Sequence, residues 1–120
     1  MRLNDKDISF LFDMYTYACE VDIFVQNISF YDYEKNKYSR WVVERLLITV
    51  GEAAKKISKE TQSLFPSIPW KTIIGARNII AHDYGDIINE KLYLISKNSI
   101  PELIKELDKI DELKYYIKIE

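Results

Sequence analysis

Apolar residues recur at steps of three and four along most of this chain, the spacing of a helix that buries one side. The spacing predicts a first helix from residue 5 to about residue 28, with Asn4 or Asp5 as its N-cap. A second helix is predicted from about residue 39 to residue 58. A third is predicted with Pro69 in its first turn and Ser67 as its N-cap, and is expected to end near Gly85, since proline suits the first turn of a helix and glycine its end.

The rest of the chain predicts shorter elements. Residues 29–37 are polar and aromatic without a helical period and predict a loop, and residues 62–67 predict a turn. After Gly85, a fourth helix is expected around residues 92–95, and Ser99–Pro101 predicts a break before a fifth helix that continues to the tail. No stretch alternates in the way that a β-strand requires.

Length and composition agree with this pattern. The chain has 120 residues, 48% of them hydrophobic, with three glycines and three prolines. We therefore expect an all-α, antiparallel four- to five-helix bundle, with residues 1–120 forming a single domain. No apolar run reaches the roughly 18 residues of a membrane span, and the first residues turn acidic too soon for a signal peptide. The single cysteine, Cys19, cannot form an internal disulfide, and a cytoplasmic location is expected.

Charge is unevenly distributed along the chain. The net charge is −2, but residues 40–82 carry seven Lys or Arg against three Asp or Glu. The segments on either side are acidic. A basic second and third helix agrees with an anionic ligand, although a structural network of ion pairs gives a similar count.

The third helix places an arginine on an apolar side. A helical projection brings together Ile73, Ile74, Arg77, Ala81 and Tyr84. A buried guanidinium is unfavourable unless it is paired, so Arg77 is expected to have an anionic partner. Glu52 in the second helix is a candidate partner for Arg77 or Arg45, and a plain surface position for Glu52 is equally open.

The same helix carries the only histidine, His82. Asn78 lies four residues before it, so the amide can hydrogen-bond the imidazole and fix its tautomer. A histidine near a helix end is also commonly a partner of the helix dipole or a surface residue. Arg77 and His82 differ by about 140° around a regular helix. They can act on one phosphate if Arg77 reaches round, if the helix unwinds, or if two chains combine their residues.

Two further features concern packing and surfaces. Gly51 lies inside the second helix, where glycine is unfavourable, and predicts a close approach of another helix. Trp41 lies on a mostly charged side of that helix, which predicts a contact surface with another chain. The tyrosines of residues 29–37 either stack on bases or pack over a helix end.

The pattern Arg-Asn-x-x-x-His-x-Tyr, formed by Arg77, Asn78, His82 and Tyr84, resembles the signature of the HEPN ribonucleases. The chain is most similar to the HepT-like toxin branch of that family. Residues 66–70 (Pro-Ser-Ile-Pro-Trp), residues 51–58 (Gly-Glu-Ala-Ala-Lys-Lys-Ile-Ser) and the Asp-Tyr-Gly-Asp after His82 extend the resemblance over nearly the whole chain.

The resemblance implies a HEPN-like bundle that forms a homodimer, with the paired motifs facing a shared cleft. It implies an endoribonuclease toxin in a type VII-like toxin–antitoxin system, with Arg77 and His82 catalytic. Asn78 is expected to support them, and so is Glu52 as the candidate partner of an arginine. No metal or other cofactor is expected, because the clustered carboxylates of two-metal nucleases are absent and RNA carries its own 2′-hydroxyl nucleophile. The expected products are a 2′,3′-cyclic phosphate and a 5′-hydroxyl.

The resemblance also implies a partner, a nucleotidyltransferase antitoxin of the MntA type that adenylylates Tyr84. A tyrosine that only packs at a helix end is the alternative for this position. A second interpretation of the whole chain is a non-catalytic subunit that binds a nucleotide or substrate for the nucleotidyltransferase. A third is a purely structural helical dimer.

Overall fold

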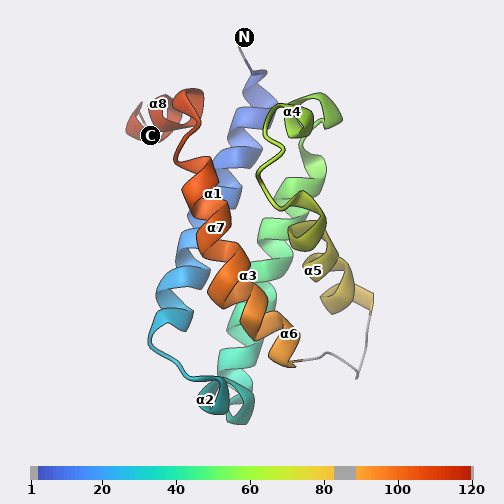
Figure 1. The fold of residues 1–120 in the computed structure, drawn as a ribbon, viewed down its shortest axis with the longest axis vertical. Coiled ribbons are helices and arrows are strands. Elements are labelled where there is room, and N and C mark those ends of the chain that lie inside the picture. The colour runs from blue at the N-terminus through green and yellow to red at the C-terminus, as the bar shows by residue number, and fades with distance from the viewer. Residues whose placement is uncertain (1–2, 83–88, 120) are drawn as a thin grey trace.

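The computed structural model describes residues 3–82 and 89–119, and within these ranges every regular element is a helix (Figure 1). The elements are α1 (Asp5–Gln26), α2 (Phe30–Lys35), α3 (Lys37–Lys56), α4 (Lys59–Leu64), α5 (Trp70–His82), α6 (Asn89–Leu94), η1 (Ile95–Ser99), α7 (Ile100–Leu107) and α8 (Asp111–Ile119). The predicted all-α bundle is confirmed. None of the helices in these ranges combines the length and apolarity needed to cross a membrane.

The long helices begin and end close to the positions that the sequence predicts. Asn4 caps α1 by accepting a 2.7 Å hydrogen bond from the backbone N–H of Asp7. Asn36 caps α3 by accepting from the backbone N–H groups of Tyr38 and Ser39. Each of these two helices ends two residues before its predicted boundary. Side-chain oxygens at both starts therefore supply the acceptors that the first turn lacks.

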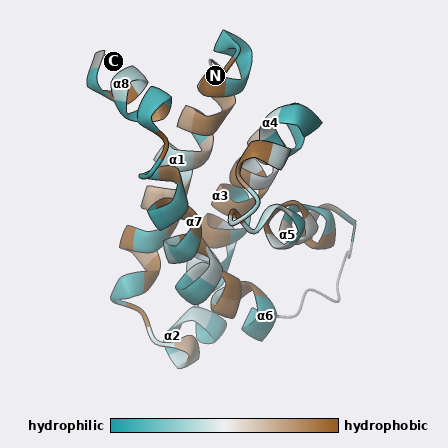
Figure 2. Cartoon of the chain, turned by 45° about the horizontal axis from the view of Figure 1, so that its top comes forward, coloured by the Kyte–Doolittle hydropathy of each residue, from teal (hydrophilic) through white to brown (hydrophobic). Residues whose placement is uncertain are grey.

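The core lies where α1, α3, α5 and α7 meet. Figure 1 shows α1 and α3 side by side and antiparallel, with α7 against α1 and α5 against the other side of α3. Hydrophobic and hydrophilic residues alternate along each helix in Figure 2, as expected for helices that bury one side. The most deeply buried large side chains include Leu11, Met14, Leu47, Ile73, Leu92, Ile100, Leu103, Leu107 and Leu113.

The prediction of a loop over residues 29–37 is wrong, because residues 30–35 form α2. Ser29 caps this short helix by accepting from Asp32 N at 3.1 Å. Tyr33 is fully buried and its ring packs against those of Phe30 and Tyr93, at centroid distances of 6.4 and 5.4 Å. Tertiary packing of the aromatic rings, rather than any helical period, holds this turn of helix in place.

Residues 59–64 form α4, so the predicted turn at residues 62–67 begins later than expected. Ser58 caps α4 and ends the extended link from α3. The predicted fifth helix is also not continuous. It ends at Leu107, and α8 begins at Asp111 after a turn closed by the bond from Ile110 N to Leu107 O. Ile110 in this turn and Leu113 in α8 are both buried.

The predicted break at Ser99–Pro101 is wrong, because α6, η1 and α7 follow one another without a gap. Residues 95–99 form a π-helical turn, in which the N–H of Ile100 bonds to the carbonyl of Ile95. Proline has no N–H and its ring crowds the carbonyl four residues before it. The wider winding of a π turn gives that carbonyl room, so the chain passes Pro101 without ending the helix.

A buried carboxylate joins the start of α1 to the link between α3 and α4. Asp7 is only 3% exposed. It accepts from the hydroxyl groups of Ser58 and Thr61, both at 2.6 Å, from Ser58 N at 3.1 Å and from Asn4 Nδ2 at 3.1 Å. Burial alone raises the pKa of a carboxyl group, but these hydrogen bonds outweigh it, and the pKa of Asp7 lies below its usual 3.8.

Candidate active site

Helix α5 carries the arginine and the histidine, and it is held against α3 along its length. Its buried residues are Ile73, Ala76 and Ile80. At its start, the indole N–H of Trp70 donates to the carbonyl of Phe65 at 3.0 Å. This bond and the apolar contacts fix where the helix begins and which side faces α3.

Gly51 of α3 lies directly against Arg77 of α5. A Cβ atom at Gly51 would overlap the Cβ of Arg77 and lie 3.0 Å from the carbonyl oxygen of Ile73. The predicted close approach at Gly51 is therefore confirmed, and the glycine is needed because no side chain fits. The first carbons of the Arg77 side chain lie on the α3 backbone, which sets the direction in which the guanidinium leaves the helix.

We expect Gly51→Ala to lower the free energy of unfolding by about 1–3 kcal/mol, because the added methyl group forces the two helices apart. Gly75→Ala is the matched control, since in the described part of the chain no atom beyond its sequence neighbours and its own helix backbone lies within 4 Å of the position of its Cβ. Removing a helical glycine without a clash should raise stability by up to about 1 kcal/mol. Urea denaturation of the two variants tests the contrast. Similar shifts for both would contradict the close contact at Gly51.

Arg77 is half-buried, and its two ends have different surroundings. At the surface, Nη1 donates to the Oδ1 of Asn78 at 3.1 Å. Nε is buried and has no hydrogen-bond partner among residues 3–82 and 89–119. Neither ion pair found among the described residues includes Arg77. The guanidinium is thus oriented by packing and by one neutral amide, and its charge is not neutralised by a carboxylate in the described part of the chain.

The expected partnership between Glu52 and an arginine is not formed in the described ranges. Glu52 is exposed and lines a hollow between α1 and α3, together with Asp13, Arg45 and Lys56. Gly51 faces α5, and the next residue points about 100° away around the helix. Glu52 therefore points away from Arg77, and its supporting role remains a prediction.

The predicted hydrogen bond from Asn78 to His82 is also not formed, because the Asn78 amide oxygen accepts from Arg77 instead. Adjacent residues on a helix point in different directions, so the spacing gave no reason to expect this contact. It forms because the long Arg77 side chain bends back over its own helix. Asn78 thus orients the arginine rather than the imidazole.

His82 is exposed and is the last residue of α5. The helix remains regular up to this point, so it does not unwind between Arg77 and His82. Five residues of α-helix separate the two side chains by about 7.5 Å along the axis and about 140° around it. Of the three predicted arrangements, two are left: Arg77 reaches round the helix, or a second chain supplies one of the residues.

Tyr84, the predicted modification site, lies outside the described residues. Among the residues that are described, no three His, Cys, Asp or Glu side chains gather closely enough to hold a metal ion. The described part of the predicted site is therefore Arg77 with Asn78, His82 at the helix end, and Glu52 on a separate surface.

Comparisons with known proteins agree with the ribonuclease pattern that Arg77, Asn78 and His82 form on α5. The family described as "Ribonuclease HepT-like" matches residues 14–110. A protein of Methanocaldococcus jannaschii named "Putative RNase" is 34% identical over 107 residues, which cover 88% of this chain and 98% of that protein. A second protein of the same name and organism is 34% identical over 106 residues, 88% of each chain.

A protein of Thermococcus cleftensis named "Probable ribonuclease HepT" is 30% identical over 90 residues, 75% of this chain and 82% of that protein. No solved structure matches the chain significantly. The family match covers α3 and α5, which carry the close contact at Gly51, the arginine and the histidine. The chain therefore belongs to the HepT-like family of ribonucleases.

Proposed function

We propose that this chain is a metal-independent endoribonuclease toxin, and that two copies of it form the cleft in which RNA is cut. The main support for the proposal is the position of Arg77. Its guanidinium is positioned by the contact with Gly51 and by the bond to Asn78, yet no carboxylate in the described chain neutralises it. An oriented arginine without an anionic partner is suited to bind a phosphate through its planar fork.

The reaction follows from these groups and from RNA itself. The 2′-hydroxyl of one nucleotide attacks the adjacent phosphorus, forming the new P–O2′ bond while the P–O5′ bond breaks. His82 side chains remove the proton from the 2′-hydroxyl and supply one to the leaving O5′. Arg77 binds the non-bridging oxygens and stabilises the added charge in the transition state. The products are a 2′,3′-cyclic phosphate and a 5′-hydroxyl.

A homodimer accounts for the placement of the two residues. Within one copy, Arg77 and His82 leave α5 in directions about 140° apart. If two copies face each other, the arginine of one can act with the histidine of the other on a single phosphate.

The proposed partner in the cytoplasm is a nucleotidyltransferase antitoxin of the MntA type, which transfers a nucleotide to Tyr84. Tyr84 follows His82 by two residues. A phosphodiester attached there adds bulk and negative charge beside the groups that bind the RNA phosphate. Inhibition then results from repulsion of the substrate.

RNA cleavage in the presence of EDTA tests the proposal. We expect the wild-type protein to cut single-stranded RNA without added metal, and Arg77→Ala to cut about 10²–10³-fold more slowly, since one stabilising donor to the developing charge is lost. Lys71→Ala, which removes an exposed cation from the same helix, is the control and should retain wild-type activity. Mass spectrometry of the fragments should find cyclic phosphate ends.

Equal cleavage by the wild type and both variants would identify a contaminating nuclease and remove support for the proposal. Absence of cleavage, together with nucleotide binding that Arg77→Ala abolishes, would favour the non-catalytic subunit of a nucleotidyltransferase.

A further inference from the structure

Three large aromatic side chains lie exposed where α2 meets α3. Tyr31 is 67% exposed, Tyr38 is 64% exposed and Trp41 is 56% exposed. The Tyr38 and Trp41 rings touch edge to face, with centroids 5.6 Å apart and planes at 89°. Phe30 and Tyr33 from the same segment pack inward, so the exposed rings are not needed to hold α2 in place.

Lysine side chains lie over these rings. Lys37 Nζ is 5.4 Å from the Tyr38 centroid and 5.7 Å from the Trp41 centroid, and Lys35 Nζ is 5.7 Å from the Tyr31 centroid. An ammonium group on a flexible stem is held only weakly by a ring at an exposed site. It can therefore move to a phosphate when a base takes its place on the ring. We call Tyr31, Lys35, Lys37, Tyr38 and Trp41 the aromatic corner.

The aromatic corner borders an open hollow of about 680 Å³. The residues that line it are Asp32, Lys35, Asn36, Lys37, Tyr38 and Arg40. They include three cations and one carboxylate, in a chain whose net charge is −2. The local charge therefore favours an anionic ligand, in contrast to the charge of the whole molecule.

Flat rings combined with mobile cations fit single-stranded RNA better than they fit a protein. Every base offers a π-face that stacks on an aromatic side chain, and every linkage offers a phosphate for a lysine. Protein interfaces are depleted of lysine, especially at their centres. Here the lysines lie directly over the rings that would form such a centre.

The aromatic corner includes the start of α3, the helix against which Arg77 of α5 packs. Trp41 precedes Gly51 by ten residues of α3, which is about 15 Å along the helix axis. Residues 41, 45, 48 and 52 share one side of α3, which leads from the corner to the hollow that Arg45 and Glu52 line, about 100° around the helix from the contact with α5. At the rise of about 3.4 Å per nucleotide of a stacked strand, roughly four to five nucleotides cover that distance.

We propose that the aromatic corner binds single-stranded RNA a few nucleotides away from the phosphate bound by Arg77, with bases stacked on Tyr38 and Trp41 and phosphates paired with Lys35 and Lys37. The proposal rests on the proposed ribonuclease function for its substrate. Its own test measures binding and needs no cleavage.

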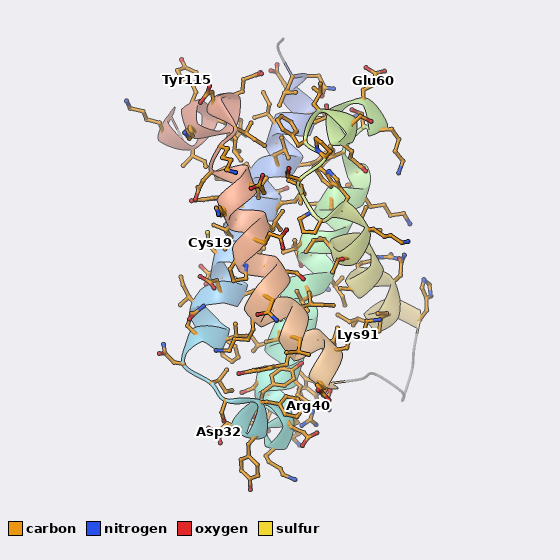
Figure 3. The ribbon with its side chains drawn as sticks, viewed as in Figure 1. Cys19, Asp32, Arg40, Glu60, Lys91 and Tyr115 are labelled. Atoms are coloured by element: carbon orange, nitrogen blue, oxygen red, sulfur yellow. The ribbon has the colours of Figure 1, made fainter. Side chains whose placement is uncertain are left out.

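The test uses a fluorescent single-stranded RNA with 2′-O-methyl groups, which has no free nucleophile, and measures its binding by anisotropy. We expect Trp41→Ala to weaken binding about 10-fold or more, and Trp41→Phe to restore most of it because phenylalanine also stacks. Tyr115→Ala is the matched control. Tyr115 is 68% exposed, and Figure 3 shows it at the opposite end of the molecule from Arg40. Its loss should leave binding unchanged.

Equal binding by Trp41→Ala and Tyr115→Ala would overturn the proposal. The proposal would also be overturned if analytical ultracentrifugation showed that the Trp41→Ala protein no longer forms the assembly that the wild type forms, because the corner would then be a protein interface. Failure of the ribonuclease function has a different signature. In that case the wild type cuts no unmodified RNA, while Trp41→Ala still weakens binding of the methylated strand.

Discussion

His82→Ala is expected to lower the rate of RNA cleavage by about 10²–10⁴-fold, the range contributed by a positioned general acid or base. His82 is exposed at the last position of α5, and no described hydrogen bond depends on it. The variant should therefore fold with a stability within about 0.5 kcal/mol of the wild type. Single-turnover cleavage of a defined RNA, with urea denaturation alongside, separates the loss of chemistry from any loss of fold.

Mixing two inactive variants tests which copies supply the two residues. If one site combines Arg77 of one copy with His82 of another, each mixed dimer of the Arg77→Ala and His82→Ala proteins retains one Arg77 and one His82 that meet across the interface, and the mixture regains part of the activity. If both residues come from one copy, the mixture remains inactive. Cleavage by His82→Ala alone at the wild-type rate would exclude the imidazole from the reaction.

Asp7→Ala is expected to lower the free energy of unfolding by about 2–4 kcal/mol at neutral pH. The change removes the buried acceptor shared by Ser58, Thr61 and Asn4, and hydrogen bonds to a charged group contribute more than neutral ones. Urea denaturation measures the effect. Asp13→Ala is the control, since Asp13 lies on the same helix but is only half-buried and should change stability by less than 1 kcal/mol.

The contribution of Asp7 should depend on pH in a defined direction. Its pKa is lower in the folded protein than the ordinary 3.8, so the folded state favours the ionised form. The resulting stability is fully present above the pKa of the unfolded chain, about 3.9, and is lost as the pH falls through the folded value. The difference between wild type and Asp7→Ala should hold from pH 7 to 5 and shrink below about pH 4. An unchanged difference at pH 3 would contradict the role of the carboxylate.

The sequence predicted the elements whose stability depends on a repeated apolar side. Helices α1 and α3 have that repeat over 22 and 20 residues, and both were placed within two residues at each end. It could not predict α2, a six-residue helix without a period that is held by the burial of Tyr33. It also could not predict the Asp7 network, because the donors Ser58 and Thr61 lie 51 and 54 residues away from the Asp7 carboxylate along the chain.

The candidate site was predicted in part. The position of Gly51 predicted a close helix contact, and the structure adds that the contact is with the stem of Arg77. The expected pairs of Glu52 with Arg77 and of Asn78 with His82 did not form. Periodicity says which residues share a side of one helix. It does not say how far a long arginine bends, or in which direction the neighbouring helix is rotated.

The π turn of η1 has a consequence for α6 and for its contact with α2. A π turn holds one residue more than the same length of α-helix, so removing one residue from η1 would restore α-helix while α6 and α7 keep nearly the same relative orientation. Tyr93 of α6 donates to the carbonyl of Ile28 at 2.6 Å and packs on Phe30 of α2. A single deletion in η1 would therefore leave this tyrosine in contact with α2. That one turn thus absorbs a change in chain length, a means by which relatives of this chain can gain or lose a residue without altering the helix that bears the arginine.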